Sequence, residues 1–399
     1  MTNQNKHQVL VVGGGFGGVK AALELAKNDN VAVTLLSDRP DFRYYPTLYH
    51  TATGGLHDQS SIPLSKILPE DKVGLVIGHA VSLDRENQQI VTENKQVLPF
   101  ESLVLALGTV TNYFGIKGLD QYSYGIKSLE EIKRFKTHLH DQLSDDRQPD
   151  LNYIIVGAGP TGIELAGSLT GYLHKIMKNH GIKHKAVHID LIEAGPRLLP
   201  RSPKPTSRAV RRHLRKLGIK LLLGQAVQGE TADSLMVSGS PLPSHTVVWT
   251  AGMTNNPFFK ANNFALNERG KVTVDVHLQT EPNIYVIGDN ADTKFSGMAQ
   301  TALRDAHFVS NNIGRVLSGK NARVYEPKLP ISIIPAGPQW AAVDWGKMHF
   351  YGRLGWGLRE AADWAGFHDL EPWWKASEQW LTELGSEEEC QVCAQAAQS

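Results

Sequence analysis

Short hydrophobic runs alternate with amphipathic stretches along most of this chain. Each run ends in a glycine-rich or small-residue turn, and segments with helical periodicity follow several of them. This alternation is typical of the strand–turn–helix units of α/β folds. The predicted strands cover residues 8–12, 31–36, 103–108, 154–156, 187–192, 247–249 and 283–289. The predicted helices cover about 19–26, 129–143 and 298–313, and another runs through Leu173.

Two further segments have less regular patterns. Residues 73–84 and 89–99 read as strands of a small β-meander. Residues 42–55, FRYYPTLYHTATGG, are aromatic and turn-rich. The sequence leaves open whether this segment forms a packed loop or passes near a flavin ring.

The most informative unit is Tyr153–Gly167, YIIVGAGPTGIELAG. Gly157 can make the tight turn, Gly159 lets the backbone approach a phosphate, and Gly162 lets the helix pack on the strand. The N-terminus of that helix then faces a dinucleotide pyrophosphate. Glu193 ends the next predicted strand, where a carboxylate bonds the free 2′-hydroxyl of NAD and repels the phosphate of NADP. The unit therefore predicts an NADH site, with NADPH the less favoured alternative.

An independent copy of this unit opens the chain. The run Gln8–Val12 leads into Gly13-Gly-Gly15-Phe-Gly-Gly18. Asp38 follows Gly18 by 20 residues, which is the usual position of an acid that bonds a ribose hydroxyl. Ser37 takes this position if the strand ends one residue earlier. The duplication predicts two dinucleotide-binding domains in one chain.

A third strand-to-turn junction, Asn283–Asp289, supports a flavin as one of the two ligands. Asp289 ends it at a position where a carboxylate can bond the ribityl chain. The N-terminus of the helix that follows can face the flavin N1/O2 edge, where negative charge develops on reduction.

Size and charge narrow the class of protein. A chain of 399 residues exceeds a usual single core, so more than one domain is expected. The 41 Lys+Arg and 40 Asp+Glu residues leave a formal charge of +1, which does not support nucleic-acid binding. No run approaches the roughly 18 apolar residues of a membrane span, and the polar N-terminus does not resemble a signal peptide. These features predict a cytoplasmic protein, or a peripheral one on the cytoplasmic face of a membrane.

Two segments leave their role open. Residues 201–216 are rich in basic side chains, but alternation with Val210 and Leu214 favours a solvated helix face over a 2′-phosphate pocket. From Pro327 the composition changes, and seven of the eight tryptophans lie in the last 60 residues. Helices are expected there at 353–367 and 373–384. Tryptophans beside Lys and Arg suit a membrane interface, a dimer contact or a cap over a quinone pocket.

Seven motifs occur in the order found in type II NADH dehydrogenases. They are GGGFGG, LVLALGTVTNYFGIKGL, VGAGPTGIELAG, IEAGPRLLP, WTAGM, NIYVIGDNA and MAQTAL. The chain resembles this family of single-subunit, flavin-dependent NADH:quinone oxidoreductases from about Gln8 to Arg315. The resemblance implies an α/β fold with two Rossmann-like dinucleotide-binding domains, similar to those of glutathione reductase, and a Trp-rich C-terminal region. The implied domains are 1–117 and 263–326 for FAD, 118–262 for NADH, and 327–399 for the C-terminal region.

The resemblance also implies individual site residues. Glu164 matches the family acid near the nicotinamide and quinone sites, where it would assist proton delivery. The alternative is a plain acid favoured by the helix dipole. Gln300 would lie by the flavin ring and the quinone pocket. The residues implied to bind the two cofactors are Gly13, Gly15, Phe16, Gly17, Gly18, Asp38, Arg39, Pro46, Thr47, Val81, Ala106, Leu107, Gly108, Gly157, Gly159, Thr161, Gly162, Glu193, Gly252, Met253, Gly288, Asp289 and Ala299.

The implied activity is hydride transfer from NADH to FAD, followed by two-electron reduction of a quinone without proton pumping. The expected partners are a quinone, a membrane surface and a second copy of the chain. One rival is a thiol or sulfide reductase, which would need Cys390 and Cys393 because the chain has no other cysteines. In a dimer these two residues could instead bind zinc, although no metal site is predicted. Another rival is a non-catalytic nucleotide-binding scaffold.

Overall fold

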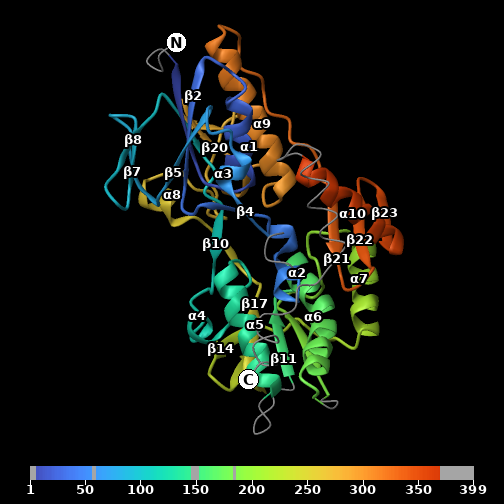
Figure 1. Ribbon diagram of the computed structural model, residues 1–399. Helices are drawn as coiled ribbons and strands as arrows, with labels where there is room; N and C mark the ends of the chain where they lie inside the picture. Colours follow the sequence, from blue (N-terminus) through green and yellow to red (C-terminus); the bar gives the residue numbers. More distant parts are fainter. Residues whose placement is uncertain (1–5, 56–59, 145–151, 183–185, 369–399) are drawn as a thin grey trace. The chain divides into compact units, whose positions relative to one another are not determined.

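The computed structural model describes residues 6–55, 60–144, 152–182 and 186–368. The chain forms two compact units (Figure 1). Unit 1 contains residues 1–43, 61–111 and 253–330, and unit 2 contains residues 44–60, 112–252 and 331–399. The main division therefore falls at 111/112 and 252/253, near the boundaries of 117/118 and 262/263 expected from the sequence. The described residues from 331 to 368 belong to unit 2.

A six-stranded sheet forms the centre of unit 1. Its order is β19-β20-β9-β1-β2-β5, in which neighbours from β20 to β5 are parallel and β19 is antiparallel. The strands β1 and β9 lie inside the sheet, and the last four residues of β1 and all of β9 are buried, which explains their continuous hydrophobic runs. The six strands are β1 (His7–Val12), β2 (Val31–Ser37), β5 (Val73–Ile77), β9 (Ser102–Leu105), β19 (Gln279–Glu281) and β20 (Ile284–Val286).

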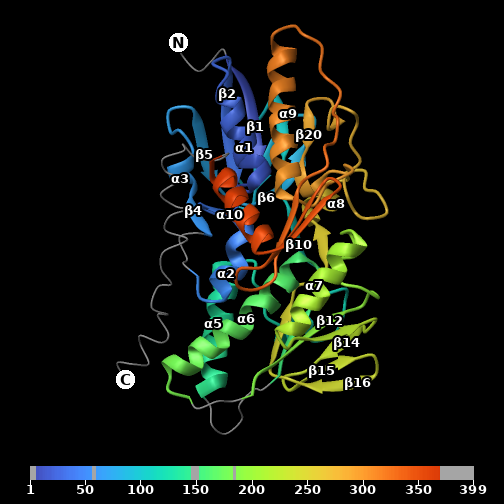
Figure 2. The same ribbon diagram turned by 90° about the vertical axis from the view of Figure 1, so that its right-hand side faces the viewer.

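Two long helices of unit 1 lie side by side, α1 (Phe16–Leu25) and α9 (Ala299–Leu317) (Figures 1 and 2). Both helices bury small residues where they meet, including Ala21 on α1 and Ala306 on α9. Ser310 on α9 donates a hydrogen bond to the Ala21 carbonyl at 3.3 Å. This close packing holds the middle of α9 against α1.

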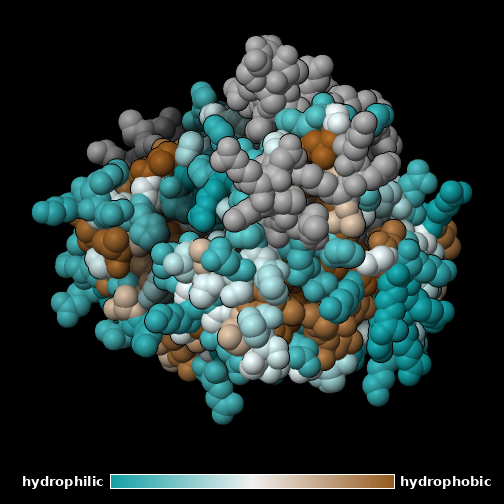
Figure 3. All heavy atoms as spheres, turned by 90° about the horizontal axis from the view of Figure 1, so that it is seen from below, coloured by the Kyte–Doolittle hydropathy of each residue, from teal (hydrophilic) through white to brown (hydrophobic). Residues whose placement is uncertain are grey.

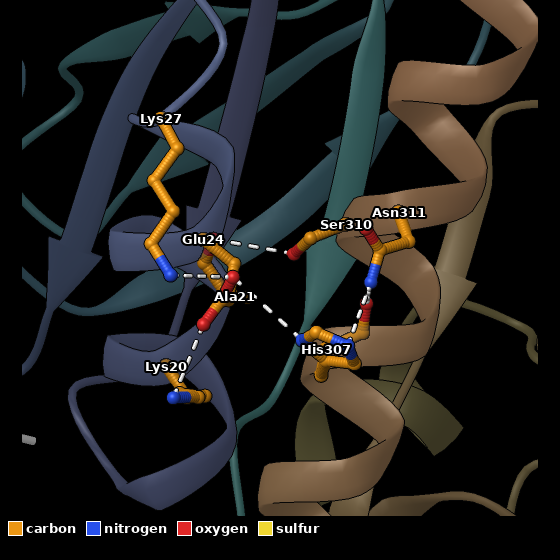
Figure 4. Close-up of polar contacts among 7 residues, drawn as sticks. All are labelled: Lys20, Ala21, Glu24, Lys27, His307, Ser310 and Asn311. Carbon is orange, nitrogen blue, oxygen red and sulfur yellow. Dashed lines mark hydrogen bonds and ion pairs between the residues drawn. The ribbon is translucent and has the colours of Figure 1, made fainter. Parts of the chain in front are cut away.

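Glu24 provides a polar contact between the same helices (Figure 4). Its carboxylate lies 3.1 Å from Lys20 Nζ and 2.8 Å from Lys27 Nζ, both on α1. It also lies 3.6 Å from His307 Nδ1 on α9. Burial would raise the pKa of Glu24, but the two lysines outweigh burial and lower that pKa below its ordinary value.

One sequence prediction for unit 1 is partly wrong. Residues 73–84 do not lie entirely in a β-meander, because β5 pairs in parallel with β2 and extends the main sheet. The turn at Gly78 separates β5 from the next strand, so one hydrophobic run supplies strands to two sheets. The small antiparallel sheet consists of β6 (Ala80–Asp84), β7 (Gln89–Thr92) and β8 (Val97–Pro99).

Shorter elements complete unit 1. The strand pairs are β3 (Asp41–Arg43) with β4 (Ser61–Pro63), and β10 (Thr109–Thr111) with β18 (Met253–Asn255). The short helices are α3 (Leu64–Ile67) and α8 (Pro257–Ala261). Asn262, which follows α8, bonds the Val81 carbonyl and the Leu83 amide, so it ties α8 to the small sheet.

A four-stranded parallel sheet forms the centre of unit 2, in the order β13-β12-β11-β17. Helices α5 and α6 pack against each other, and α2 packs against both. The strands are β11 (Asn152–Val156), β12 (His188–Glu193), β13 (Lys220–Leu223) and β17 (Thr246–Trp249). The helices are α2 (Leu48–Ala52), α4 (Leu119–Tyr122), α5 (Leu129–Ser144), α6 (Pro160–Asn179) and α7 (Lys204–Lys216). The central predicted strands and helices of this unit are therefore confirmed.

Two antiparallel sheets and a C-terminal helix complete unit 2. The sheets are β14 (Val227–Glu230), β15 (Ser234–Val237) and β16 (Ser240–Pro243), and β21 (Ser332–Pro335), β22 (Ala341–Trp345) and β23 (Met348–Gly352). The predicted helix at 353–367 is confirmed as α10 (Arg353–His368), whereas the helix predicted at 373–384 lies outside the described residues. Within the described ranges, no helix is both long enough and apolar enough to cross a membrane.

Candidate functional site

The first glycine-rich turn forms a cradle between β1 and α1. Gly13 has a φ of +119°, and a Cβ there would lie 2.2 Å from the Ala106 carbonyl oxygen. A Cβ at Gly18 would lie 1.8 Å from the Gly13 carbonyl oxygen. These two positions therefore require glycine. Gly15 differs, because a Cβ there would meet no atom within 4 Å.

The second glycine-rich turn, between β11 and α6, repeats this geometry. Gly157 has a φ of +106°, and its Cβ would lie 2.7 Å from the Ala251 amide nitrogen. A Cβ at Gly162 would lie 1.9 Å from the Gly157 carbonyl oxygen. A Cβ at Gly159 would meet nothing within 4 Å. The two turns thus share two crowded glycines and one glycine that faces open space.

Both cradles fit a dinucleotide pyrophosphate. Gly15 is the N-cap of α1 and Gly159 is the N-cap of α6, and neither helix start has a side-chain cap. The first amides of each helix are therefore available to an anion, which the positive end of the helix dipole also favours. The open space at the middle glycine lets a phosphate approach this backbone. Thr161 is exposed beside the second cradle, in the first turn of α6.

The strand after the first cradle ends differently from its counterpart. β2 ends at Ser37, which is buried and donates a hydrogen bond to the Arg39 carbonyl at 2.7 Å. The Asp38 side chain is 44% exposed and lies 2.6 Å from the Arg39 guanidinium. Asp38 is therefore the accessible acid at this strand end, whereas the Ser37 hydroxyl stabilises the turn that follows the strand through its hydrogen bond to Arg39.

Glu193 closes the second cradle. It ends β12, and one carboxylate oxygen accepts from the Ala158 amide at 2.9 Å. The other oxygen accepts from the Gly195 amide at 2.8 Å. Ala158 belongs to the glycine turn itself, so this acid both holds the turn and places negative charge beside it.

A short 3-10 helix, η4 (Gly288–Asn290), follows β20 and contains the predicted ribityl-binding residue Asp289. Asn290 is fully buried, and its amide group exchanges hydrogen bonds with the Gly108 amide (2.9 Å) and carbonyl (2.6 Å). It also donates to the Asn255 side chain at 2.6 Å. Asn290 therefore ties η4 to the loop that follows β9, and it is not among the residues expected from the sequence although it directly follows Asp289.

Asp305 on α9 also holds η4 in place, and it too is not among the residues expected from the sequence. It is fully buried, and one oxygen accepts from the Gly288 amide at 3.0 Å. The other oxygen accepts from the Tyr325 hydroxyl at 2.5 Å. The pKa of Asp305 is raised to about 6, mainly by burial and also by nearby Asp289, against the lowering effect of these two hydrogen bonds and of Lys271. A carboxylate in the middle of an apolar helix face is the signal that could have revealed it.

The remaining residues predicted in unit 1 lie around these loops. Phe16 and Gly17 open α1, with Phe16 edge-on to Phe42 at 5.0 Å. Ala106 and Leu107 follow β9. Ala299 and Gln300 form the first turn of α9, which has no side-chain cap. The exposed predicted residues are Val81 on β6 and Met253 on β18, which are 42% and 48% exposed.

The remaining residues predicted in unit 2 are more dispersed. Pro46 and Thr47 lie in the 3-10 helix η2 (Tyr45–Thr47), where Thr47 is buried and bonds the Tyr44 carbonyl. Glu164 is half-buried in the second turn of α6. Gly252 has a φ of +72° and packs closely on Phe114.

Cys390 and Cys393 lie outside the described residues. Among the residues that the structure describes, no group of three or more His, Cys, Asp or Glu side chains could hold a metal ion.

A family model for pyridine nucleotide-disulphide oxidoreductases matches residues 7–306. This range contains both cradles, η4 and the start of α9. It extends over about three quarters of the chain.

Curated relatives include two type II NADH:quinone oxidoreductases. The protein from Mycobacterium tuberculosis is 27% identical over 354 residues, which cover 81% of this chain and 75% of the relative. The protein from Staphylococcus saprophyticus is 27% identical over 350 residues, which cover 81% of this chain and 86% of the relative. The similarity extends over most of both proteins.

Solved structures show the same fold. NDH2 from Plasmodium falciparum, determined in complex with NADH, has a TM-score of 0.84 at 18% identity and covers 95% of this chain and 97% of its own. The sulfide:quinone oxidoreductase from Aquifex aeolicus has a TM-score of 0.76 at 21% identity and covers 94% of this chain and 92% of its own. At such identities the likeness concerns the fold alone.

Proposed function

The chain belongs to the pyridine nucleotide-disulphide oxidoreductase family, and on this premise we propose that it is an FAD-dependent NADH:quinone oxidoreductase. The observation that carries the proposal is the pair of cradles, each with an open middle glycine and an uncapped helix N-terminus, in two separate units. The curated relatives that bear the name NADH:quinone oxidoreductase match both units.

We assign FAD to the first cradle and NADH to the second. Gly15 and the first amides of α1 hold the FAD pyrophosphate, Asp38 bonds the adenosine ribose, and Asp289 bonds the ribityl chain. Asn290 and Asp305 position Asp289 by fixing η4. The uncapped start of α9, at Ala299, offers its dipole to the flavin edge. Bound FAD supplies two-electron chemistry that couples NADH oxidation to quinone reduction.

The second cradle holds the NADH pyrophosphate at Gly159 and the start of α6. Glu193 favours the 2′-hydroxyl of NADH and disfavours the 2′-phosphate of NADPH, because its charge is fixed beside the turn by two backbone amides. Glu164 and Gln300 are our candidates for proton delivery and quinone contact. Their tests are Glu164→Gln and Gln300→Ala, which should lower quinone turnover while flavin reduction by NADH persists.

We further propose that the C-terminal part of unit 2 contacts a membrane surface, where quinones reside. Among the described residues of this part, four large apolar side chains are exposed: Trp345 (50%), Met348 (52%), Leu354 (63%) and Trp364 (40%). Amphipathic aromatic and aliphatic groups of this kind suit the interface of a bilayer. Vesicle sedimentation of the wild type against a Trp345→Ser/Leu354→Ser variant tests this contact.

Sedimentation velocity tests the expected homodimer.

The direct test of the function is sequential reduction of the purified yellow protein. NADH should bleach the flavin under anaerobic conditions, NADPH should do so more slowly, and menadione should then restore the colour. A protein that bleaches with NADH but passes electrons to no quinone would contradict the quinone assignment and favour the thiol-reductase alternative. A protein that binds both nucleotides without bleaching would favour the scaffold alternative.

A further inference from the structure

Helix α7 carries a high density of cations on its outer face. Its inner face buries Val210 and Leu214. The exposed cations are Lys204, Arg208, Arg211, Arg212, Arg215 and Lys216. Within the described part of the chain, none of these side chains has an ion-pair or hydrogen-bond partner. Helix α7 lies on the right in Figure 1. Figure 3, which is turned about the horizontal axis, shows hydrophilic side chains at its right-hand edge.

Three of these cations line a cavity in unit 2. Arg208, Arg212 and Lys216 are spaced four residues apart, so they follow one edge of the helix. Together with the rings of Trp340 and Tyr351 they line a cavity of about 390 Å³. No carboxylate is among its lining residues. The volume lies within the range of roughly 300–1,000 Å³ that is typical of small-molecule sites.

One wall of this cavity is a rigid aromatic pair. The ring of His213, from α7, stacks on the ring of Trp340 with centroids 4.3 Å apart and planes inclined by 7°. Burial, and to a smaller extent Lys216, lowers the pKa of His213. The imidazole is therefore neutral at pH 7, adds no positive charge, and presents a flat apolar surface with Trp340.

Tyr351, which also lines the cavity, belongs to a network of hydrogen bonds. Thr206 Oγ1 donates to Asp344 Oδ1 at 2.5 Å, and the Tyr351 hydroxyl lies 3.2 Å from the same Thr206 oxygen. His349 Nδ1 lies 2.7 Å from Asp344 Oδ1. Asp344 Oδ1 thus pairs with Thr206 and His349, Oδ2 is buried without a hydrogen-bond partner among the described residues, and Asp344 is not one of the residues that line the cavity.

From these features we propose that the cavity between α7 and the β21–β23 sheet binds an organic phosphate. Arginines recognise phosphate through paired, charge-assisted hydrogen bonds, so Arg208 and Arg212 receive the phosphate with Lys216 beside them. The apolar part of the ligand packs against Trp340 and Tyr351. The ligand is either a soluble phosphate ester or the headgroup of a phospholipid, which share this chemistry. The site is independent of the proposed redox reaction, because it contains no residue of either glycine cradle.

Calorimetric titration of the FAD-loaded protein with phenyl phosphate tests the soluble form of the ligand. Sedimentation with vesicles of phosphatidylglycerol, compared with phosphatidylcholine, tests the headgroup form. The decisive variant is Arg208→Gln/Arg212→Gln. Its matched control is Arg211→Gln/Arg215→Gln, which removes the same charge from the same helix outside the cavity.

We expect the cavity variant to weaken binding of at least one probe by about tenfold or more, because it removes the paired hydrogen bonds. We expect the control variant to stay within about twofold of the wild type. Equal weakening by both variants would show diffuse attraction and overturn the proposal, as would the absence of binding to every probe.

A second substitution locates the bound ligand. Phenyl phosphate should change the intrinsic fluorescence of the wild type, and Trp340→Phe should remove most of that change while the calorimetric affinity persists. An undiminished fluorescence change in Trp340→Phe would place the ligand elsewhere and overturn the proposal. Circular dichroism of each variant verifies that α7 and the surrounding unit remain folded.

Discussion

At the scale of single residues, Asp305 is the position through which α9 controls the proposed flavin loop. Its carboxylate holds the Gly288 amide and the Tyr325 hydroxyl in a fully buried place. In Asp305→Asn, the side-chain NH2 group faces either the Gly288 amide or the Tyr325 hydroxyl, both of which are hydrogen-bond donors. One buried polar group is then left without an acceptor. We expect the free energy of unfolding to fall by about 1–3 kcal/mol and FAD to dissociate faster. Thermal unfolding and the recovery of free-flavin fluorescence measure the two effects.

Two other substitutions separate loop positioning from general destabilisation. Tyr325→Phe removes one partner of Asp305 but keeps the Gly288 bond, so it should lower stability with a smaller effect on FAD dissociation. Asp292→Asn changes an exposed acid just after η4 and should alter neither quantity. If Asp305→Asn retains FAD as firmly as the wild type, then Asp305 has no positioning role.

Glu230 predicts a pH dependence of stability in unit 2. Its side chain is 8% exposed, and Oε2 has no hydrogen-bond partner within the described ranges. Burial raises its pKa from 4.5 to about 8. The native state therefore retains this proton longer than the unfolded state, and stability is lost as pH rises from about 4.5 through about 8.

Glu230→Gln should remove this dependence. We expect the variant to exceed the wild type by roughly 1–3 kcal/mol above pH 8, because it avoids burying an unsatisfied charge. Urea unfolding between pH 5 and pH 9 measures the difference, with pH 5 as the internal reference. A variant whose stability follows that of the wild type across this range would contradict the assignment.

At the scale of elements, His138 on α5 predicts that the stability of unit 2 depends on pH in the acid range. It lies 2.8 Å from Thr246 Oγ1 and stacks on Tyr124 with centroids 4.5 Å apart. Its pKa is lowered from 6.5 to about 4, mainly by burial and also by the electrostatic influence of His245 and Arg134, while a hydrogen bond with the His245 backbone opposes the lowering. The unfolded state therefore takes up the proton first, and stability is lost as pH falls from about 6.5 toward about 4.

His138→Gln should reduce this acid sensitivity while keeping a hydrogen-bonding side chain. Because His138 is only half-buried, we expect part of the full linkage, roughly 1–2 kcal/mol of unfolding free energy between pH 7 and pH 5. His174→Gln changes an exposed histidine on α6 and serves as the control. Equal slopes of stability against pH in the wild type and His138→Gln would contradict this account.

The elements also show what the sequence could predict. The two strand–turn–helix units were predicted correctly because each motif is contiguous in the sequence, although Gly13 and Gly157 also pack against Ala106 and Ala251, which lie far away in the sequence. The partner of β5 was not, because a hydrophobic run does not say which strand it will pair with. Asn290 and Asp305 were missed for the same reason, since their partners Gly108 and Gly288 lie far away in sequence or in another element.

At the scale of the whole molecule, the two cradles allow FAD and NADH binding to be separated. The middle glycines have φ values of −90° at Gly15 and −75° at Gly159, which any residue adopts, and an added Cβ meets no protein atom within 4 Å. Substitution there should preserve the fold and obstruct only the phosphate. Gly18→Ala and Gly162→Ala should instead destabilise the fold, because their Cβ atoms would overlap carbonyl oxygens.

Gly15→Val should therefore yield a folded, colourless protein that still binds NADH. Gly159→Val should stay yellow and raise the KM for NADH by about tenfold or more, because phosphate contacts at a helix N-terminus are lost. Flavin absorbance, NADH titration and circular dichroism measure these outcomes on the same preparations. Each variant should lose only one ligand, FAD in Gly15→Val and NADH in Gly159→Val. Loss of both ligands in either variant would mean that the cradles do not act as two separate sites.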